Sequence, residues 1–414
     1  MEKIKTVVCG CGHRGIWLAE TISMIDTYNL LAVCDICFDK AETAQKELKE
    51  KHNQDVLIYA DYLKMFEEQR PEVAVVSTNW KYHVEIAIEA MKQGIAVAME
   101  VGGAYNLEEC YELVKTYEET KTPFFFLENC CFGSKELLAL SLVRNGVLGE
   151  ICYCSGAYGH DLREEILTGD VNRHYRLNEY ITKNRENYPT HELGPIAKIL
   201  NINSGNRMVS LVSSASKSRS LHNTTMQHEE YKHLRDVEFK QGDIVVTTIT
   251  CENGELITLT LDTTLPRFYS REFCVRGTNG WFNENNNMVY LDGYEHMKWQ
   301  SNEGYAHYAN YAEKYYDEYM PFICKNMTEE AVKAGHDGMD YLEFVCFADC
   351  FLNKKPMPID VYDAASWMSI AYLSEISIQN NGQAVEIPDF THGLYKTRKT
   401  IDVTDIPVVK KIKI

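Results

Sequence analysis

The feature that most constrains this chain is a glycine-rich motif, Gly10-Cys-Gly12-His-Arg-Gly15, which lies between an apolar strand and a helix. The strand covers residues 6–8, and we expect the helix to begin at Ile16. In dinucleotide-binding units the first glycine allows a tight turn, the second lets the backbone approach a pyrophosphate, and the third allows helix and strand to pack closely. The helix N-terminus also offers backbone N–H groups to phosphates. The motif therefore predicts a parallel sheet that binds a dinucleotide.

An acidic residue at the end of the next apolar run indicates which dinucleotide this is. Asp35 follows Gly15 by about 20 residues, the spacing at which a carboxylate accepts hydrogen bonds from the ribose hydroxyls. A carboxylate would repel a 2′-phosphate, so we expect NAD rather than NADP. His13 and Arg14 either contact phosphate or face solvent.

The order of apolar runs predicts two domains. Up to about Asn129, short β-branched runs alternate with helical stretches, which is typical of a parallel sheet with covering helices. Longer alternating runs follow, with turn signals at Asn253-Gly254 and Asn279-Gly280. We predict an α/β fold with an N-terminal Rossmann domain, residues 1–129, and a C-terminal α/β domain, residues 130–414, on an open, mainly antiparallel sheet. The predicted strands are residues 6–8, 30–34, 73–77, 96–99 and 124–127, then 151–158, 208–216, 244–251, 255–262 and 271–276.

Three further stretches are less regular. The polar residues 218–243 are predicted to form a long loop. Residues 290–319 are rich in tyrosine and fit either a helix or a covering flap. Residues 364–378 have helical periodicity and are expected to pack on a sheet.

Composition narrows the functional classes. The formal net charge of −18 over 414 residues disfavours nucleic acid and anionic membranes as partners, because both require a basic face. The 14 cysteines lack the spacing of a disulfide framework, and no Cys/His cluster has zinc spacing, so we expect no metal and a reducing cytoplasm. The N-terminus lacks the pattern of an export signal, and no apolar run reaches the length of a membrane span.

The N-terminal half resembles the Gfo/Idh/MocA oxidoreductases. The resemblance rests on Ser77-Thr-Asn79-Trp-Lys-Tyr-His83, the helix after it, and Glu100-Val101-Gly102. Dehydrogenases of this superfamily usually have Glu-Lys-Pro at the last position, so Val101 replaces their catalytic lysine. Asn79 is interpreted as a cofactor contact and His83 as either a cofactor contact or a loop-stabilising residue. The predicted cofactor-binding residues are Gly10, Gly12, His13, Arg14, Gly15, Asp35, Asn79, His83, Glu100 and Asn129.

Later segments resemble one branch of this superfamily, the NAD-dependent α-N-acetylgalactosaminidases of glycoside hydrolase family 109. The most specific stretch is Tyr188-Pro-Thr-His-Glu-Leu-Gly-Pro195. The other matching stretches, in family order, are residues 127–131, 156–163, 203–207, 262–270 and 335–340. The resemblance implies a glycosidase in which NAD oxidises C3 of a sugar, the aglycone leaves by elimination, water adds at C1, and the hydride returns. It also implies a homo-oligomer, because the open sheet often forms dimers in this superfamily.

Such chemistry requires a base for the 3-hydroxyl, a base for C2 and groups that stabilise an enolate. The residues that match the family's catalytic positions are Glu128, Tyr158, Arg176, Tyr188, His191 and Tyr269. A phenol is a poor base at neutral pH unless a cation lies close to it, and Arg176 is the candidate cation. From the residues alone, Tyr188 and His191 also fit a helix cap, and Tyr158 and Tyr269 also fit simple packing. His160 and Asp161 fit either an internal hydrogen-bonded pair or the site.

Two positions depart from the family pattern, since Glu192 and Asp337 both replace a glycine. Two rival functions also remain. The first is a sugar or polyol dehydrogenase that releases NADH, which Val101 disfavours. The second is a non-catalytic NAD-binding sensor, which the number of matching catalytic residues disfavours.

Overall fold

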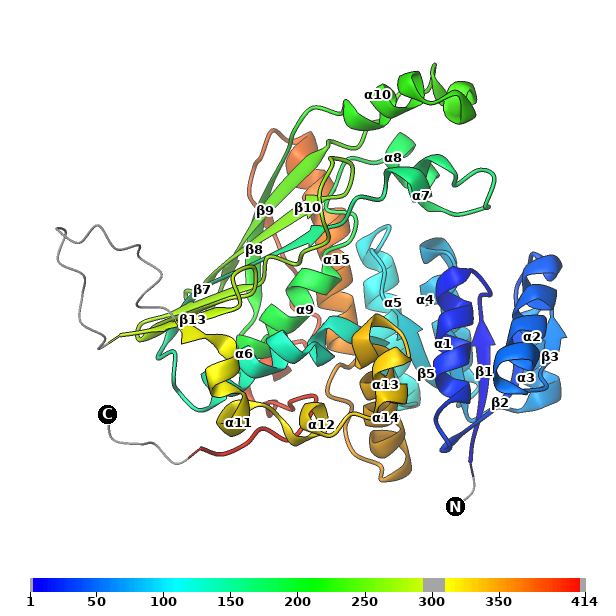
Figure 1. Ribbon diagram of the computed structural model, residues 1–414, viewed down its shortest axis with the longest axis horizontal. Helices are drawn as coiled ribbons and strands as arrows, with labels where there is room; N and C mark the ends of the chain where they lie inside the picture. Colours follow the sequence, from blue (N-terminus) through cyan, green and yellow to red (C-terminus); the bar gives the residue numbers. More distant parts are fainter. Residues whose placement is uncertain (1–2, 293–309, 410–414) are drawn as a thin grey trace. The chain divides into compact units, whose positions relative to one another are not determined.

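The computed structural model describes residues 3–292 and 310–409 (Figure 1). Within these residues the chain forms two compact units, each made from two segments. The first contains Met1–Phe132 and Met327–Tyr372, and the second contains Gly133–Asn326 and Leu373–Ile414. The first segment ends close to the predicted boundary at residue 129. The return of residues 327–372 to the first unit was not part of the sequence prediction, which placed them in the C-terminal domain.

The first unit is built on a six-stranded parallel sheet in the order β3-β2-β1-β4-β5-β6. Its central strands are buried on both faces, as expected for β-branched runs between two helical layers. The short strand β3 was not predicted, because Leu57–Tyr59 is too brief to show an alternating pattern. The strands are β1 Ile4–Cys9, β2 Tyr28–Cys34, β3 Leu57–Tyr59, β4 Val73–Val76, β5 Ala96–Glu100 and β6 Phe124–Leu127.

Helices connect these strands and supply the covering layers (Figure 1). The helix after the glycine-rich motif begins at His13 rather than at Ile16, because Gly12 already adopts the extended N-cap conformation. The helices are α1 His13–Ser23, α2 Phe38–His52, α3 Tyr62–Gln69, α4 Trp80–Lys92 and α5 Leu107–Thr120, followed by the 3₁₀ turn η1 Asn129–Phe132. The strand order reverses at β1 and β4, and the crevice beyond the carboxyl ends of such strands is where ligands bind in open parallel sheets.

The later segment of the first unit packs beside β6. The backbone N–H of Phe126 donates to the carbonyl of Ile359 at 3.0 Å, and the rings of Phe125 and Phe347 lie 5.7 Å apart. These contacts join segments that are distant in sequence, which is why the sequence pattern alone did not predict them. The elements of this segment are α13 Glu329–Lys333, η5 His336–Gly338, α14 Met339–Leu352 and the first part of α15 Val361–Gln379.

The second unit is built on a nine-stranded sheet in the order β14-β13-β12-β11-β7-β10-β9-β8-β15. The sheet is mainly antiparallel, as predicted, but β10 pairs with β7 in parallel, so it is mixed. Asn253-Gly254 and Asn279-Gly280 lie at hairpin turns. The strands are β7 Ile151–Gly159, β8 Met208–Ala215, β9 Ile244–Cys251, β10 Leu256–Asp262, β11 Cys274–Gly277, β12 Gly280–Asn283, β13 Met288–Leu291, β14 Asn310–Tyr311 and β15 Val385–Glu386.

Helices lie along one side of this sheet, where α9 Thr190–Ile199 packs on β7 and also contacts α6 Ser134–Arg144 (Figure 1). The prediction of a long loop at 218–243 was wrong, because this segment contains α10 Ser220–Gln227 and η2 Glu229–Leu234. Both Asp243 carboxylate oxygens lie within hydrogen-bonding distance of the Ser220 backbone N–H, at 3.1 and 3.2 Å, and hold the start of α10 from a position distant in sequence. Most of the tyrosine-rich stretch at 290–319 lies outside the described residues.

Other short helices complete the second unit. They are α7 Arg163–Leu167, α8 Arg176–Thr182, η4 Ala312–Tyr315, α11 Tyr316–Tyr319, α12 Phe322–Lys325 and η6 Leu394–Lys396.

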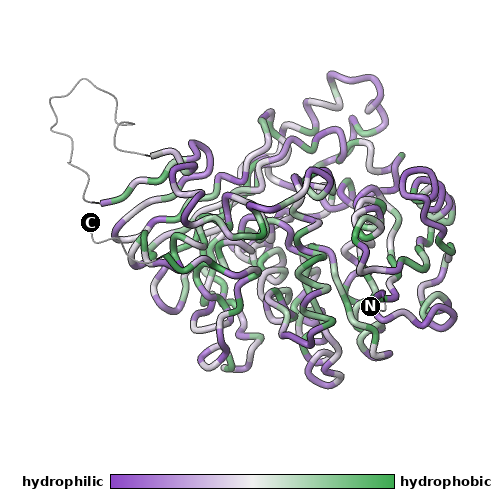
Figure 2. The backbone as a smooth tube through the Cα atoms, turned by 60° about the horizontal axis from the view of Figure 1, so that its bottom comes forward, coloured by the Kyte–Doolittle hydropathy of each residue, from purple (hydrophilic) through white to green (hydrophobic). Residues whose placement is uncertain are grey.

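The backbone carries long hydrophobic stretches in strands and helices, whereas many connecting loops are hydrophilic (Figure 2). Across the described part of the chain, no helix combines the length and apolar character needed to cross a bilayer.

Candidate functional site

The glycine-rich loop has the geometry of a pyrophosphate cradle. Gly10 has a φ of +100°, and a Cβ placed there would lie 2.3 Å from the carbonyl oxygen of Ser77. A Cβ at Gly15 would lie 1.9 Å from the carbonyl oxygen of Gly10. A Cβ at Gly12, in contrast, would meet nothing within 4 Å. Two glycines are therefore required by packing within the protein, whereas Gly12 leaves open space at the N-terminus of α1, where a phosphate would approach.

Asp35 lies directly after β2 and ties the loop to that strand. One carboxylate oxygen accepts from the Cys11 backbone N–H at 2.8 Å, and the other accepts from the Cys37 backbone N–H at 2.8 Å. Each oxygen keeps a further lone pair, so these bonds are compatible with accepting the ribose hydroxyls as well. The residues present thus fit a bound NAD.

We expect Asp35→Ala to weaken NAD binding by about 1–3 kcal/mol, because hydrogen bonds to a charged acceptor are lost. Isothermal titration of the NAD-free protein, prepared by removing any bound nucleotide, with NAD and with NADP measures this change. Asp55→Ala, an exposed site beyond α2, is the matched control and should retain the wild-type affinity. Equal binding of NAD and NADP by the unmodified protein would contradict the assignment of Asp35.

Arg14 has a different environment from either predicted one. Its guanidinium donates to Asp340 at 2.6 and 3.0 Å and to Glu100 at 2.7 Å. Burial opposes ionisation of Asp340, but Arg14 and the hydrogen bond from His336 outweigh it and hold the pKa of this carboxyl below its usual range. Because its donors are directed at carboxylates, Arg14 joins the glycine-rich loop to α14 rather than facing phosphate or solvent. The same contact occupies Glu100, which was predicted to bind the cofactor.

The remaining cofactor candidates lie after β1 and β4, at the start of α1 and at the N-cap and in the first turn of α4. The Asn79 side chain caps α4 by accepting from the Lys81 backbone N–H at 3.0 Å. His83 is buried and hydrogen-bonds the Thr78 carbonyl, and burial lowers its pKa to about 4. His83 therefore stays neutral at pH 7 and stabilises the loop. His13 packs against Trp17, with ring centroids 4.1 Å apart. Val101, at the position of the superfamily lysine, is only 1% exposed.

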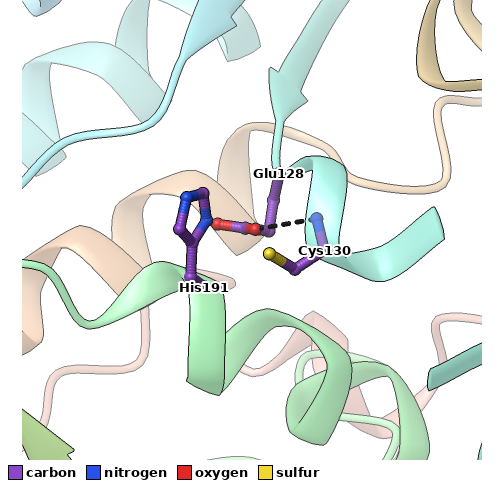
Figure 3. A group of neighbouring side chains, drawn as sticks. All are labelled: Glu128, Cys130 and His191. Atoms are coloured by element: carbon purple, nitrogen blue, oxygen red, sulfur yellow. Dashed lines mark hydrogen bonds between the residues drawn. The ribbon is translucent and has the colours of Figure 1, made fainter. Parts of the chain in front are cut away.

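Glu128 and Asn129 follow β6. Glu128 is fully buried, and its Oε1 accepts from the Cys130 backbone N–H at 3.1 Å (Figure 3). The Asn129 amide donates to Asp340 at 2.8 Å. Asp340 therefore binds both Arg14 and Asn129, a role that the sequence analysis missed, although residues 335–340 were among the matching stretches. The sequence match indicated that residues 335–340 are important but did not indicate which residues they contact.

The second unit brings together five of the six predicted catalytic residues. The rings of Tyr158 and Tyr188 stack with centroids 4.5 Å apart at an interplanar angle of 20°. His191, in the first turn of α9 (Figure 3), lies edge-on to both, at 5.6 Å from Tyr158 and 4.8 Å from Tyr188. The Arg176 guanidinium carbon lies 5.1 Å from the Tyr188 ring centroid. His160 lies 5.9 Å from Tyr158 and connects this group to Tyr269 at 5.1 Å. We call these six residues the aromatic cluster: Tyr158, His160, Arg176, Tyr188, His191 and Tyr269.

A buried polar network holds the chain just before Tyr188. The Arg185 guanidinium donates to Glu179 at 2.7 Å and to the Asn187 side chain at 2.9 Å, and Asn187 donates to Gln241 at 2.7 Å. Since Arg185 and Glu179 are almost fully buried, breaking this pair would leave an uncompensated charge. The network fixes the backbone from which Tyr188 and the start of α9 extend.

The structure also resolves the alternatives at His160 and Asp161. Asp161 pairs with Arg163 at 2.7 and 2.9 Å, so the predicted pair between His160 and Asp161 is replaced by a neighbouring arginine. The hydroxyl of Tyr158 lies 3.5 Å from Nδ1 of His160. Burial and the nearby Arg176 lower the pKa of His160. His160 therefore belongs to the aromatic cluster.

The two departures from the family pattern have local structural consequences. Glu192 is 1% exposed and packs on β7, where a Cβ on Gly156 would lie 2.6 Å from the Glu192 Cβ. Asp337 is exposed and has a φ of +55°, a conformation that favours glycine. The extra volume of Glu192 is thus accommodated by Gly156, and the backbone explains why glycine suits position 337.

Comparisons with known proteins agree with this architecture. Residues 4–127 match the family model described as "Oxidoreductase family, NAD-binding Rossmann fold", and residues 132–397 match that of "Glycosyl hydrolase 109, C-terminal domain". The chain belongs to glycosyl hydrolase family 109. A family 109 protein of Stenotrophomonas maltophilia is 35% identical over 98% of this chain and 92% of its own length. An α-N-acetylgalactosaminidase of Tannerella forsythia is 34% identical over 94% of this chain and 86% of its own length.

Solved structures support the fold of this family 109 enzyme. An oxidoreductase from Agrobacterium radiobacter, solved with NAD+, has a TM-score of 0.67 at 14% identity and covers 93% of this chain and 98% of its own. A scyllo-inositol dehydrogenase from Lactobacillus casei has a TM-score of 0.64 at 13% identity, and the match covers 93% of this chain and 99% of the dehydrogenase. These structures show the fold alone, whereas the family-model match of residues 4–127 confirms the resemblance to the oxidoreductase superfamily. The protein combines this NAD-binding Rossmann domain with the family 109 domain.

Proposed function

We propose that this protein hydrolyses glycosides with a permanently bound NAD, with α-N-acetylgalactosaminides as the first substrate class. One observation carries the proposal: Tyr158, Arg176, Tyr188, His191 and Tyr269, drawn from four separate stretches of sequence, form one aromatic cluster. The curated names of the Tannerella forsythia and Shewanella oneidensis relatives support the substrate class.

Bound NAD would supply a hydride acceptor and later a hydride donor. The protein's own residues must then move protons, since elimination of the aglycone requires bases for the sugar 3-hydroxyl and for C2. Tyr188 and His191 would supply these bases, with their rings held 4.8 Å apart. The Arg176 cation on the Tyr188 ring face favours the phenolate form of that base. In the first unit, Gly10–Gly15 and Asp35 would hold the cofactor, and Glu128 is proposed to act beside the nicotinamide.

Deuterium incorporation distinguishes this mechanism from its rivals. A direct hydrolase uses two carboxylates and leaves the C2–H bond intact. In heavy water, hydrolysis of an aryl α-N-acetylgalactosaminide should give a sugar that carries deuterium at C2, with no net NADH. Mass spectrometry and proton NMR of the product measure this, and the free sugar incubated with the enzyme controls for exchange after release.

The other outcomes each contradict a part of the proposal. A product that stays fully protonated at C2 would exclude the elimination mechanism. Steady accumulation of NADH with an oxidised product would identify a dehydrogenase. Hydrolysis of plain galactosides or glucosides in preference to α-N-acetylgalactosaminides would leave the mechanism in place and change the proposed substrate class. Glu192 and Asp337, the two departures from the family pattern, would then be relevant to that change.

We also propose a homo-oligomer that assembles through the outer face of the nine-stranded sheet. Apolar side chains are exposed on this face at Val212, Val246 and Leu256 of the adjacent strands β8, β9 and β10. Trp281 is also exposed, on β12, which β7 and β11 separate from β10. Covering such a surface with a second copy would remove apolar area from water. A cytoplasmic location is proposed as well, because all 14 cysteines have free thiols.

A further inference from the structure

An acidic residue outside every recognised motif binds the cation of the aromatic cluster. Glu165, on α7, accepts a hydrogen bond through Oε1 from Arg176 Nε at 2.7 Å. The same oxygen lies 3.5 Å from His174 Nε2. The Arg176 side chain is only 11% exposed, whereas that of Glu165 is 45% exposed. Glu165 thus contacts Arg176 from the solvent side.

On its other side, Arg176 faces the phenols of the aromatic cluster. Its guanidinium carbon lies 5.1 Å from the ring centroid of Tyr188 and 5.7 Å from that of Tyr175. The ring of Tyr158 stacks on the ring of Tyr188. Titratable groups that interact with Arg176 include Tyr158, His160, Glu165, Tyr175 and Tyr188. Those that interact with His160, beside Arg176, also include Asp161 and His191.

We propose that Glu165 is a positioning residue that controls the ionisation of Tyr188 through Arg176. Its carboxylate orients the planar guanidinium toward the Tyr188 ring and offsets part of the positive charge that stabilises the phenolate. The kinetic consequence rests on the proposed function, because it takes Tyr188 as a catalytic base. The contact between Glu165 and Arg176 is independent of that assignment.

Glu165 carries its charge at the pH of interest. Burial raises the pKa of this carboxyl, but Arg176 and His174 outweigh that effect and lower it overall. A carboxyl whose pKa is lowered in the folded protein keeps its ion pair at neutral pH and loses it only as the pH falls through that lowered value. Neutralising Glu165 by substitution therefore removes a charge that is present throughout the neutral range.

The test compares Glu165→Gln with Glu164→Gln. In Glu165→Gln the Arg176 guanidinium loses this carboxylate, so more of its positive charge acts on Tyr188, which should ionise at lower pH. We expect the acid limb of the kcat/KM profile to move down by about 0.5–1 pH unit. Glu164→Gln makes the same charge change one residue away, at an exposed side chain, and should leave the profile unchanged. Glu165→Asp keeps the charge and should restore most of the wild-type profile.

A second readout does not require turnover. Tyrosinate absorbance is titrated for the unmodified protein and for Glu165→Gln, and in each case the curve of the same protein with Tyr188→Phe is subtracted. The Tyr188 transition should move to lower pH in Glu165→Gln. An unchanged transition would overturn the proposal, as would a raised KM with an unchanged pH profile, which would make Glu165 a substrate contact. If no glycoside is hydrolysed, the proposed function fails, and the absorbance titration still decides the role of Glu165.

Discussion

His191→Ala and Tyr188→Phe should each lower turnover by at least about two orders of magnitude, the typical contribution of a positioned acid or base. The reason is geometric, because the two rings lie 4.8 Å apart in one cluster, with Tyr188 just before α9 and His191 in its first turn. NAD should remain bound in both variants, since these residues lie outside the unit that contains the glycine-rich loop. Steady-state kinetics and the nucleotide released on denaturation measure the two effects.

Matched controls in the same unit keep this prediction specific. His222→Ala removes an exposed imidazole from α10, and Tyr153→Phe removes a hydroxyl from β7 on the side away from Tyr158. Both controls should retain turnover within about twofold of wild type, as is usual for surface substitutions. Near-native turnover in His191→Ala and Tyr188→Phe together would remove this pair from the mechanism.

The glycine-rich loop should separate stability from cofactor binding. Gly15→Ala places a Cβ 1.9 Å from the Gly10 carbonyl oxygen, a backbone atom that cannot rotate away. We expect the free energy of unfolding to fall by about 3 kcal/mol or more. Gly12→Ala places its Cβ in open space, so unfolding should change by no more than about 1 kcal/mol, the usual effect of an alanine at an N-cap.

For NAD affinity, in contrast to stability, the larger effect is expected from Gly12→Ala. The Cβ of Gly12→Ala occupies the space that a pyrophosphate requires, so NAD affinity should fall at least about tenfold while the fold persists. Urea unfolding of the NAD-free protein and calorimetric titration with NAD measure the two quantities on the same samples. A Gly12→Ala protein that binds NAD with wild-type affinity would contradict the proposed cradle.

Local sequence patterns predicted much of the fold because the responsible interactions are local. Strand periodicity indicated β1, β2, β4, β5 and β6, and the G-x-G-x-x-G spacing indicated the turn into α1. Where a distant residue determines a conformation, prediction failed. The start of α10 is held by Asp243, and residues 327–372 belong to the first unit through contacts with β6.

The same distinction between local and long-range interactions applies to the candidate site. The sequence by itself determined which residue types are present: the three glycines, Asp35, and the tyrosines and histidines of the family 109 motifs. Only the tertiary structure decided their partners. It directed Arg14 to Asp340 and Glu100 and placed Glu165 of α7 against Arg176 of α8. The physical reason is that an ion pair or ring stack depends on distances of a few ångströms between distant segments, and these are fixed only when strands, helices and buried networks pack together.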